Sequence, residues 1–445
     1  MLVILVVAAV IIALLAGAHW YVWRRLVRDV TARTSKARRV GTVAAVIMPL
    51  LSLSALGAGQ VEGAPFWLQR ALAWPGFLWL ALLLYGVLAL VVGEAVRPLL
   101  LRALERRATP VAGPVSLAAV TALPETAAVL PTNGATGPAP PAATQSAWSQ
   151  AHESLIAPKR DGERKVPQPS GVSRRLFVSR AVGGAAAAVA VGTVGYGTYG
   201  VLRGPRVKRI TVPLAKLPRS AHGYRIAVVS DIHLGPILGR AHTQRIVDTI
   251  NSTQPDLVAV VGDLVDGSVA DLGTAAEPLA QLRARHGSYF VTGNHEYYSG
   301  VEEWVERVRE LGVHPLRNAR VEIPGFDLAG VNDVSGENHG DAPDYGRALG
   351  DRDRSRAAVL LAHQPVMIHE AVEHGVDLQL SGHTHGGQLW PGNLIAALDN
   401  PTVAGLERYG DTQLYVTRGA GAWGPPVRVG APSDIAVVEL ASRQA

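Results

Sequence analysis

The N-terminal half of the chain contains four stretches without a single Asp, Glu, Lys or Arg, at residues 1–23, 40–61, 71–93 and 181–202. A helix needs about 20 apolar residues to cross the hydrocarbon core of a bilayer, and each stretch reaches that length. The first three are rich in Leu, Val, Ile and Trp. We therefore expect three transmembrane helices within residues 1–107.

The fourth stretch consists mainly of Ala, Gly and Val, and the sequence SRRLFV at residues 173–178 precedes it. Two arginines ahead of a weakly apolar core resemble a twin-arginine export signal. The alternative is a pair of ordinary arginines that keep their end of a membrane helix in the cytoplasm. In either case we expect residues 173–203 to contain this twin-arginine-like motif and a fourth transmembrane or signal-anchor helix.

Basic residues set the expected orientation in the membrane. Residues 24–39 carry seven Lys or Arg and one acidic residue, and arginines flank both membrane ends of the loop that begins at Arg97. Cytoplasmic loops are enriched in Lys and Arg, so both loops are expected inside. The cell membrane is then the expected location, with several passes and an extracytoplasmic C-terminal half. Residues 108–172 are largely Pro-, Ala- and Thr-rich and predict a disordered cytoplasmic linker.

Charge is divided unevenly along the chain. Residues 1–203 contain 20 Lys and Arg against 8 acidic residues, whereas residues 204–445 contain 22 against 28. The basic excess flanks the apolar stretches, which is typical of membrane topology rather than of contacts with a phosphate backbone, and we expect no nucleic-acid binding. The absence of Cys excludes disulfides, Cys-ligated zinc, iron–sulfur centres and thiol catalysis. Any metal must be held by His, Asp, Glu or Asn.

From residue 204 onward, short apolar runs alternate with helical patterns. Strands are expected at residues 225–229, 257–261, 288–292, 327–331, 358–362, 378–380, 413–417 and 435–440. Helices are expected at residues 242–251, 275–285, 301–311 and 365–373. This alternation predicts one α/β domain at residues 204–445, with layered sheets that are covered by helices.

Five of the expected strands are followed at once by residues that can bind metal ions. The five segments contain, in order, Asp231 and His233, Asp263 and Asp266, Asn294 to Glu296, His363, and His383 and His385. Ligands bind beyond the carboxyl ends of strands in α/β sheets, so we expect these segments to converge. Each segment alone has an ordinary interpretation as a turn, a helix cap or a core histidine. Folding does not require the ordered set of five.

The ordered set resembles the calcineurin-like metallophosphoesterase superfamily, whose signature runs D-x-H, G-D-x-x-D, G-N-H-E, H and G-H-x-H. The resemblance covers about residues 222–440, and no ligand position departs from it. The runs GHTHGGQ at 382–388 and RGAGAWGPPVR at 418–428 are similar to the membrane-bound branch, transmembrane proteins with a metallophosphoesterase domain. The resemblance implies a layered β-sandwich flanked by helices, preceded here by an all-α transmembrane region.

The resemblance also implies two divalent metal ions, of Mn, Fe or Zn. Asp263 would bridge the two ions, and each ion would have three further ligands: Asp231, His233 and His385 for one, and Asn294, His363 and His383 for the other. The implied role of His295 is to protonate the leaving oxygen or to stabilise charge there. Asp266 and Glu296 are expected either to orient metal-bound imidazoles or to serve a turn or helix start.

The implied activity is the hydrolysis of a phosphomonoester, phosphodiester or pyrophosphate by attack of a metal-bridging hydroxide. The membrane tether favours a lipid-linked substrate, while a soluble nucleotide or phosphodiester stays open. A second hypothesis is a non-catalytic, metal-stabilised membrane sensor or scaffold module. The intact His295 beside a full ligand set argues against this second hypothesis.

Overall fold

The computed structural model describes residues 2–58, 64–106 and 173–443. The expected linker at 108–172 lies outside these residues. The chain divides into two compact units, one formed by Met1–Val96 with Ser179–Ala445 and the other by Arg97–Val178. The first unit contains the whole C-terminal domain and most of the apolar helices. In the second unit, the described residues are the last turns of one long helix and the first turns of the next.

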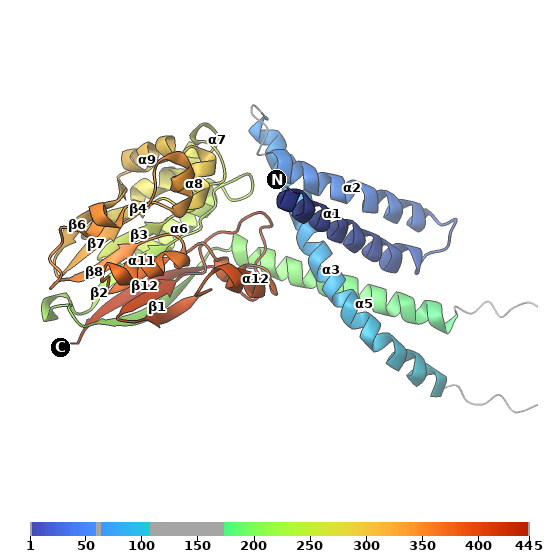
Figure 1. The fold of residues 1–445 in the computed structure, drawn as a ribbon. Coiled ribbons are helices and arrows are strands. Elements are labelled where there is room, and N and C mark those ends of the chain that lie inside the picture. The colour runs from blue at the N-terminus through green and yellow to red at the C-terminus, as the bar shows by residue number, and fades with distance from the viewer. Residues whose placement is uncertain (1, 59–63, 107–172, 444–445) are drawn as a thin grey trace, which may run out of the picture. The chain divides into compact units, whose positions relative to one another are not determined.

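Within the part of the chain that the structure describes, four helices are long and apolar enough to cross a membrane (Figure 1). They are α1 (Leu2–Trp23), which a π-helical turn follows, α2 (Lys36–Ala58), α3 (Phe66–Arg106) and α5 (Arg174–Leu202). Each contains one of the four charge-free stretches, nearly in full. Helix α3 has 41 residues, so at 1.5 Å per residue it is about 60 Å long. It is therefore longer than a hydrocarbon core of about 30 Å.

Small residues let α2 and α3 approach each other closely. A Cβ atom on Gly76 of α3 would clash with Ala55 and with the backbone carbonyl of Leu51, both on α2. At the same contact, the Oγ of Ser52 donates a hydrogen bond to the Gly76 carbonyl at 2.9 Å. Contacts of this kind are typical of helices that pack in a bilayer, because lipid provides no hydrophobic drive for helix association.

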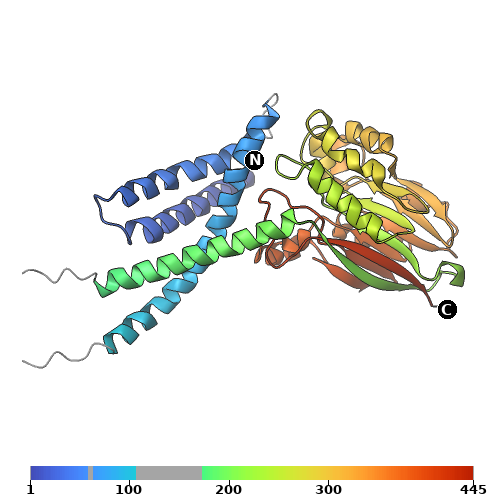
Figure 2. The same cartoon turned by 180° about the vertical axis from the view of Figure 1, so that it is seen from behind.

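The C-terminal domain contains two six-stranded sheets (Figures 1 and 2). The first has the order β1 (Arg206–Leu214), β12 (Asp434–Ser442), β2 (Tyr224–Val229), β3 (Leu257–Val261), β4 (Ser288–Val291) and β5 (His314–Pro315). The second has the order β10 (Gly405–Tyr409), β11 (Thr412–Val416), β9 (Leu378–Ser381), β8 (Ala357–Leu361), β7 (Phe326–Gly330) and β6 (Ala319–Ile323). The eight expected strands are all present.

Alternating side chains along the strands form the separate layers of the core. Ile226 and Val228 of β2 belong to the cluster between the two sheets, whereas Ala227 and Val229 belong to the cluster under the helices. Helices α6 (Arg240–Ser252), α7 (Val269–Ala276) and α9 (Val301–Glu310) cover the first sheet, and α10 (Tyr345–Leu349) and α11 (Ile368–Glu373) cover the second. The predicted layered β-sandwich with flanking helices is confirmed.

Two expected helices differ in the structure, and the one expected at 365–373 begins as a 3-10 helix at Pro365–Met367 before α11. The helix expected at 275–285 is instead the end of α7, followed by a 3-10 helix at Glu277–Gln281. Pro278 stands in the first turn of that 3-10 helix. Proline has no N–H to donate, so an α-helix cannot run through this position without losing a hydrogen bond. Strands β1, β5, β6 and β10 and the short helices α8 (Asn294–Ser299), α10 and α12 (Gly392–Asp399) were not expected.

Parallel pairing brings the carboxyl ends of the strands together. Strands β2, β3 and β4 are parallel neighbours in the first sheet. Strands β7, β8, β9 and β11 are parallel neighbours in the second. Each run of strands therefore ends at one edge of its sheet, and the five expected metal-binding segments leave the sheets there.

Candidate metal centre

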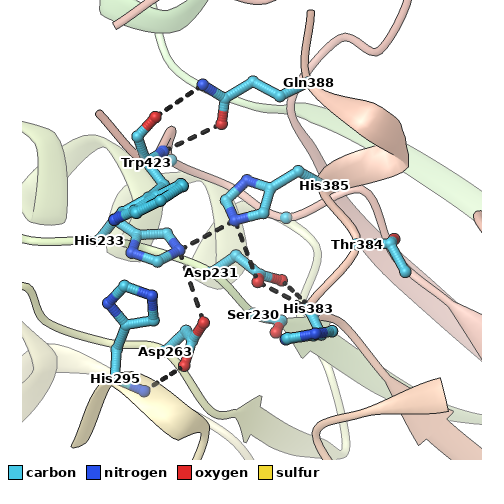
Figure 3. A network of polar contacts seen from close by, with 12 residues as sticks. Ser230, Asp231, His233, Asp263, His295, His383, Thr384, His385, Gln388 and Trp423 are labelled. Atoms are coloured by element: carbon cyan, nitrogen blue, oxygen red, sulfur yellow. Dashed lines mark hydrogen bonds and ion pairs between the residues drawn. The ribbon is translucent and has the colours of Figure 1, made fainter. Parts of the chain in front are cut away.

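The loops at this edge hold five of the expected ligands in an uncommon backbone conformation. These residues have positive φ angles of 49° to 71°: Asp231, His233, Asp263, His383 and His385. Residues with a side chain rarely adopt this left-handed conformation, and such strain is concentrated at functional sites. Figure 3 shows that the side chains of these residues gather in one place.

Two glycines of the expected motifs are required by close approaches between loops. A Cβ atom on Gly382 would clash with the side chains of Ser230 and Asp231. A Cβ atom on Gly293 would clash with the carboxylate and backbone nitrogen of Asp263. The glycines therefore let the loop after β9 approach the loop after β2, and the loop after β4 approach the loop after β3.

Asp231, His233 and His385 form the first ligand group. One potential ligand atom from each lies within 4.8 Å of the others. The Nε2 atoms of His233 and His385 are 3.0 Å apart, and His385 Nε2 lies 3.4 Å from Asp231 Oδ1. All three residues are buried. Two imidazoles and a carboxylate that face one point are a suitable donor set for a divalent metal ion.

Asp263, His363 and His383 form the second ligand group, again with ligand atoms within 4.8 Å of one another. His363 Nε2 lies 3.2 Å from Asp263 Oδ2. Asn294 joins this group, because its Oδ1 lies 3.0 Å from His383 Nδ1.

A single carboxylate oxygen reaches both ligand groups. Asp263 Oδ2 lies 3.2 Å from His363 Nε2 in the second group and 3.7 Å from His233 Nε2 in the first. Its other oxygen, Oδ1, accepts a hydrogen bond from the backbone N–H of His295 at 3.0 Å. Asp263 thus occupies the position of a carboxylate shared between two sites.

Further contacts fix the Nδ1 atoms of His233 and His363, the ring nitrogens that point away from the centre. His233 Nδ1 donates to Asp266 Oδ1 at 2.7 Å, and His363 Nδ1 donates to the Val261 carbonyl at 2.8 Å. These bonds leave Nε2 of each ring for the centre, an arrangement that is typical of metal-bound histidines. Asp266 therefore orients an imidazole, which was one of its two expected roles.

Glu296 has the other expected role. Its carboxylate accepts hydrogen bonds from the backbone N–H groups of Asp263, Leu264 and Gly293, at 2.6 to 3.0 Å. The Gly293 bond lies at the start of helix α8, where backbone N–H groups lack partners within the helix. Glu296 therefore joins the loop after β3 to the loop after β4 through their main chains.

His295 lies at the rim of the centre. Its Nδ1 lies 2.8 Å from Asp266 Oδ1, the same oxygen that holds His233. The rings of His233 and His295 are perpendicular, with centroids 4.8 Å apart. The indole ring of Trp423 packs edge-on against His295 at 5.8 Å. His295 therefore lies beside the first ligand group and shares Asp266 with it.

The residues fit a bound metal cation. His363 Nε2 is buried and makes no hydrogen bond within the described residues, although Asp263 Oδ2 lies 3.2 Å away. Burial raises the pKa of Asp263, but the neighbouring His363 and His233 outweigh burial and hold the pKa of this carboxyl well below its usual range. A metal ion needs deprotonated carboxylates and unprotonated imidazole nitrogens as ligands. The low pKa keeps Asp263 deprotonated, as a metal ligand must be, and a buried carboxylate of this kind is costly without a cationic partner.

Arg428 makes contacts with His385 that the sequence did not predict. This buried arginine donates from Nη2 to His385 Nδ1 at 3.0 Å and from Nη1 to the His385 carbonyl at 3.1 Å. Gln388 joins the same two segments, through hydrogen bonds to the backbone carbonyl and N–H of Trp423 at 2.8 and 3.0 Å (Figure 3). The only sequence signal was the RGAGAWGPPVR run itself, which contains both Trp423 and Arg428.

The fold and the centre together define a class: an α/β sandwich with a histidine- and carboxylate-rich metal site at its strand ends. The family described as Calcineurin-like phosphoesterase matches residues 224–387, which contain all seven expected ligands and His295. A metallophosphoesterase of Aquifex aeolicus is 35% identical over 240 residues, which cover 53% of this chain and 91% of that protein. The chain belongs to the calcineurin-like metallophosphoesterase family.

Two longer relatives match the same part of the chain. A transmembrane protein with metallophosphoesterase domain from Danio rerio is 40% identical over 259 residues, covering 55% of this chain and 59% of that protein. A metallophosphoesterase from Helicobacter pylori is 39% identical over 247 residues, covering 55% of this chain and 66% of that protein. The chain thus spans about three fifths of these relatives.

Proposed function

We propose that this chain is a membrane-anchored phosphoesterase that hydrolyses a phosphomonoester, phosphodiester or pyrophosphate carried by a lipid. The observation that supports the proposal most strongly is the position of Asp263 Oδ2, within 3.7 Å of histidines from both ligand groups. A carboxylate shared in this way is what a site for two neighbouring cations requires.

The chain offers ligands for two divalent ions, of Mn, Fe or Zn. Asp231, His233 and His385 would hold one ion, Asn294, His363 and His383 the other, and Asp263 both. Such a pair supplies charge that neutralises phosphoryl oxygens and a nucleophilic water at neutral pH.

His295 is the proposed proton donor to the leaving oxygen. Asp266 lies at its Nδ1, which leaves Nε2 to hold the proton that is given to the substrate. The ring is only partly buried, so a substrate can reach it. A positioned histidine of this kind contributes about 100- to 10,000-fold to the rate of proton-transfer chemistry.

A cavity beside the centre supports a lipid-linked substrate. It has a volume of about 300 Å³, and His233 and Asp266 line it together with apolar residues of the loops that carry Ile237 and Trp423. Side chains of the long helices complete it, among them Leu56 of α2 and Phe77 of α3. A phosphate at the centre could therefore place an attached hydrocarbon chain among apolar groups.

The proposed location is the cell membrane, crossed several times, with the C-terminal domain outside the cytoplasm. The seven basic residues at 24–39 support this orientation. A reporter protein fused after Ala445 in intact cells should report the extracytoplasmic side. A cytoplasmic signal would reverse the orientation and bring cytoplasmic lipid precursors back as substrates.

Activity is tested with the full chain in lipid nanodiscs, supplied with Mn²⁺ and either a chromogenic phosphodiester or a panel of lipid phosphates. The wild type should hydrolyse members of the panel only with metal present, and His295→Asn should bind metal but lose at least about 100-fold in rate. His369→Asn, on the exposed side of α11, is the matched control and should keep full activity. If the wild type binds metal but hydrolyses nothing, the sensor or scaffold hypothesis replaces the enzyme.

A further inference from the structure

Helix α12 exposes its large apolar side chains. Leu394 is 63% exposed, Ile395 69% and Leu398 81%, and the helix has no buried residue. Trp390, just before the helix, is 53% exposed. Helices of a domain that sits in water normally turn one apolar face to the core. In the same domain, α6 does so with Ile246, which is fully buried.

The backbone, rather than an apolar face, holds α12 in place. A Cβ atom on Gly387 would clash with the backbone of Asn393, so the start of the helix lies directly against the segment that carries His385. The N–H of Gly392 donates to the Leu389 carbonyl at 2.6 Å. The exposed leucines are therefore fixed in position and do not result from a loose end of the chain.

The segment before α12 contacts apolar helices of the same compact unit. The hydroxyl of Tyr85 on α3 donates to the Trp390 carbonyl at 3.0 Å. Leu389 packs in a cluster with Tyr85 and with Val194 of α5. Tyr85 lies within the charge-free stretch 71–93, and Glu94, nine residues further along, is about 14 Å away along the helix axis. Because the hydrocarbon core is about 30 Å thick, Tyr85 lies at a depth that lipid occupies.

We propose that α12 and Trp390 insert into the bilayer, with Leu394, Ile395 and Leu398 in contact with lipid acyl chains. The contact between Leu389 and the two membrane helices continues directly into this exposed face. Hydrocarbon is the occupant that favours three neighbouring aliphatic side chains without any polar partner. The helix follows the His385 segment, so its insertion would hold the metal centre beside the lipid headgroups. This last consequence rests on the proposed hydrolytic activity, whereas the insertion rests only on the proposed membrane location.

The absence of Cys from the chain allows a direct test with single labels. Ile395→Cys and Leu398→Cys are made in the full chain, labelled with bimane and reconstituted into vesicles of equimolar phosphatidylcholine and phosphatidylglycerol. Val372→Cys is the control: it is 37% exposed on α11, beside a pocket that Lys216 and Arg408 also line. Quenching is measured with doxyl-labelled phosphatidylcholine from the lipid side and with iodide from the water side.

Labels at 395 and 398 should be quenched by the doxyl lipid and protected from iodide, with the reverse result at 372. Quenching of the label at 398 by iodide to the same extent as at 372 would place α12 in water and overturn the proposal. Protection of that label from both quenchers would also overturn it, because a protein surface, such as a second copy of the chain, would then cover the helix. No result depends on hydrolysis, so a failure here is distinct from a failure of the proposed enzyme.

Discussion

The two ligand groups of the centre are supported in different ways. In the first group, charged side chains from other loops hold the histidines: Asp266 holds His233, and Arg428 holds His385. In the second group, His363 is held by the backbone carbonyl of Val261, the last residue of the buried strand β3. The second group therefore depends on the fold itself, and the first depends on side chains that single substitutions can remove.

Substitution of Asp263, the ligand that both groups share, should have the largest effect on metal binding and should weaken both groups alike. Asp263→Asn removes the charge that both groups contact. Loss of an outer partner costs about 10- to 100-fold in metal affinity or activity, so loss of this ligand should exceed 100-fold. Metal content and Mn²⁺-dependent hydrolysis are measured together, with the exposed Asp248→Asn as control. Wild-type metal content in Asp263→Asn would contradict the shared role.

Substitution of Asp266 should weaken metal binding at the first group and leave the second group unchanged. Asp266→Ala leaves the Nδ1 atoms of His233 and His295 without their carboxylate. We expect Mn²⁺ to bind about 10- to 100-fold more weakly at the first group and unchanged at the second. A titration followed by electron paramagnetic resonance resolves the two binding steps. Equal weakening of both steps would show that the groups are not independently supported.

Substitution of Arg428 tests the other support of the first group. Arg428→Lys keeps a positive charge but loses the fork of donors that reaches the His385 ring and main chain. We expect a loss of about tenfold in first-group affinity, the lower bound for an outer partner. Arg408→Lys, on the exposed strand β10, should bind metal as the wild type does. Unchanged affinity in both variants would show that Arg428 does not support the first ligand group.

His242, a buried histidine outside both ligand groups, should affect the stability of the fold rather than metal binding. Burial, together with Arg245 and Arg428, lowers the pKa of His242 to about 3. The folded chain then keeps His242 neutral while the unfolded chain binds a proton below pH 6.5, so stability falls as the pH drops from 6.5 toward 3, by up to about 1.4 kcal/mol per pH unit.

His242→Leu should remove that part of the acid sensitivity. The measurement is the difference in unfolding temperature between pH 7.5 and pH 5.5, which should be smaller in His242→Leu than in the wild type. His314→Leu, at an exposed position, is the control and should behave as the wild type does. An unchanged difference in His242→Leu would show that His242 does not titrate with unfolding.

The sequence predicted much of this structure because both of its strongest signals are local. Buried parallel strands are continuous apolar runs, and each expected ligand follows such a run within a few residues. Strand β1 was missed because three of its first four residues are basic, so it lacks a continuous apolar run, and it lies at the sheet edge, where it pairs with β12. Helix α12 was missed because its apolar residues follow a Trp-Pro-Gly segment that resembles a turn.

The supports of the centre were harder to predict, because they join distant parts of the chain. Asp266 could be weighed as a partner since it stands three residues after Asp263 in one motif. Arg428 lies 43 residues after His385, and no periodicity or spacing relates the two. Glu296 could be assigned to backbone contacts only once the loops after β3 and β4 were seen to lie side by side.

The most direct test of the account is an anomalous-difference map from crystals of the full chain grown with Mn²⁺. Two peaks should appear, one beside Asp231, His233 and His385 and one beside Asn294, His363 and His383, with Asp263 contacting both. A map with no peak among these side chains, or with Asp263 turned away from the peaks, would contradict a centre built for two ions.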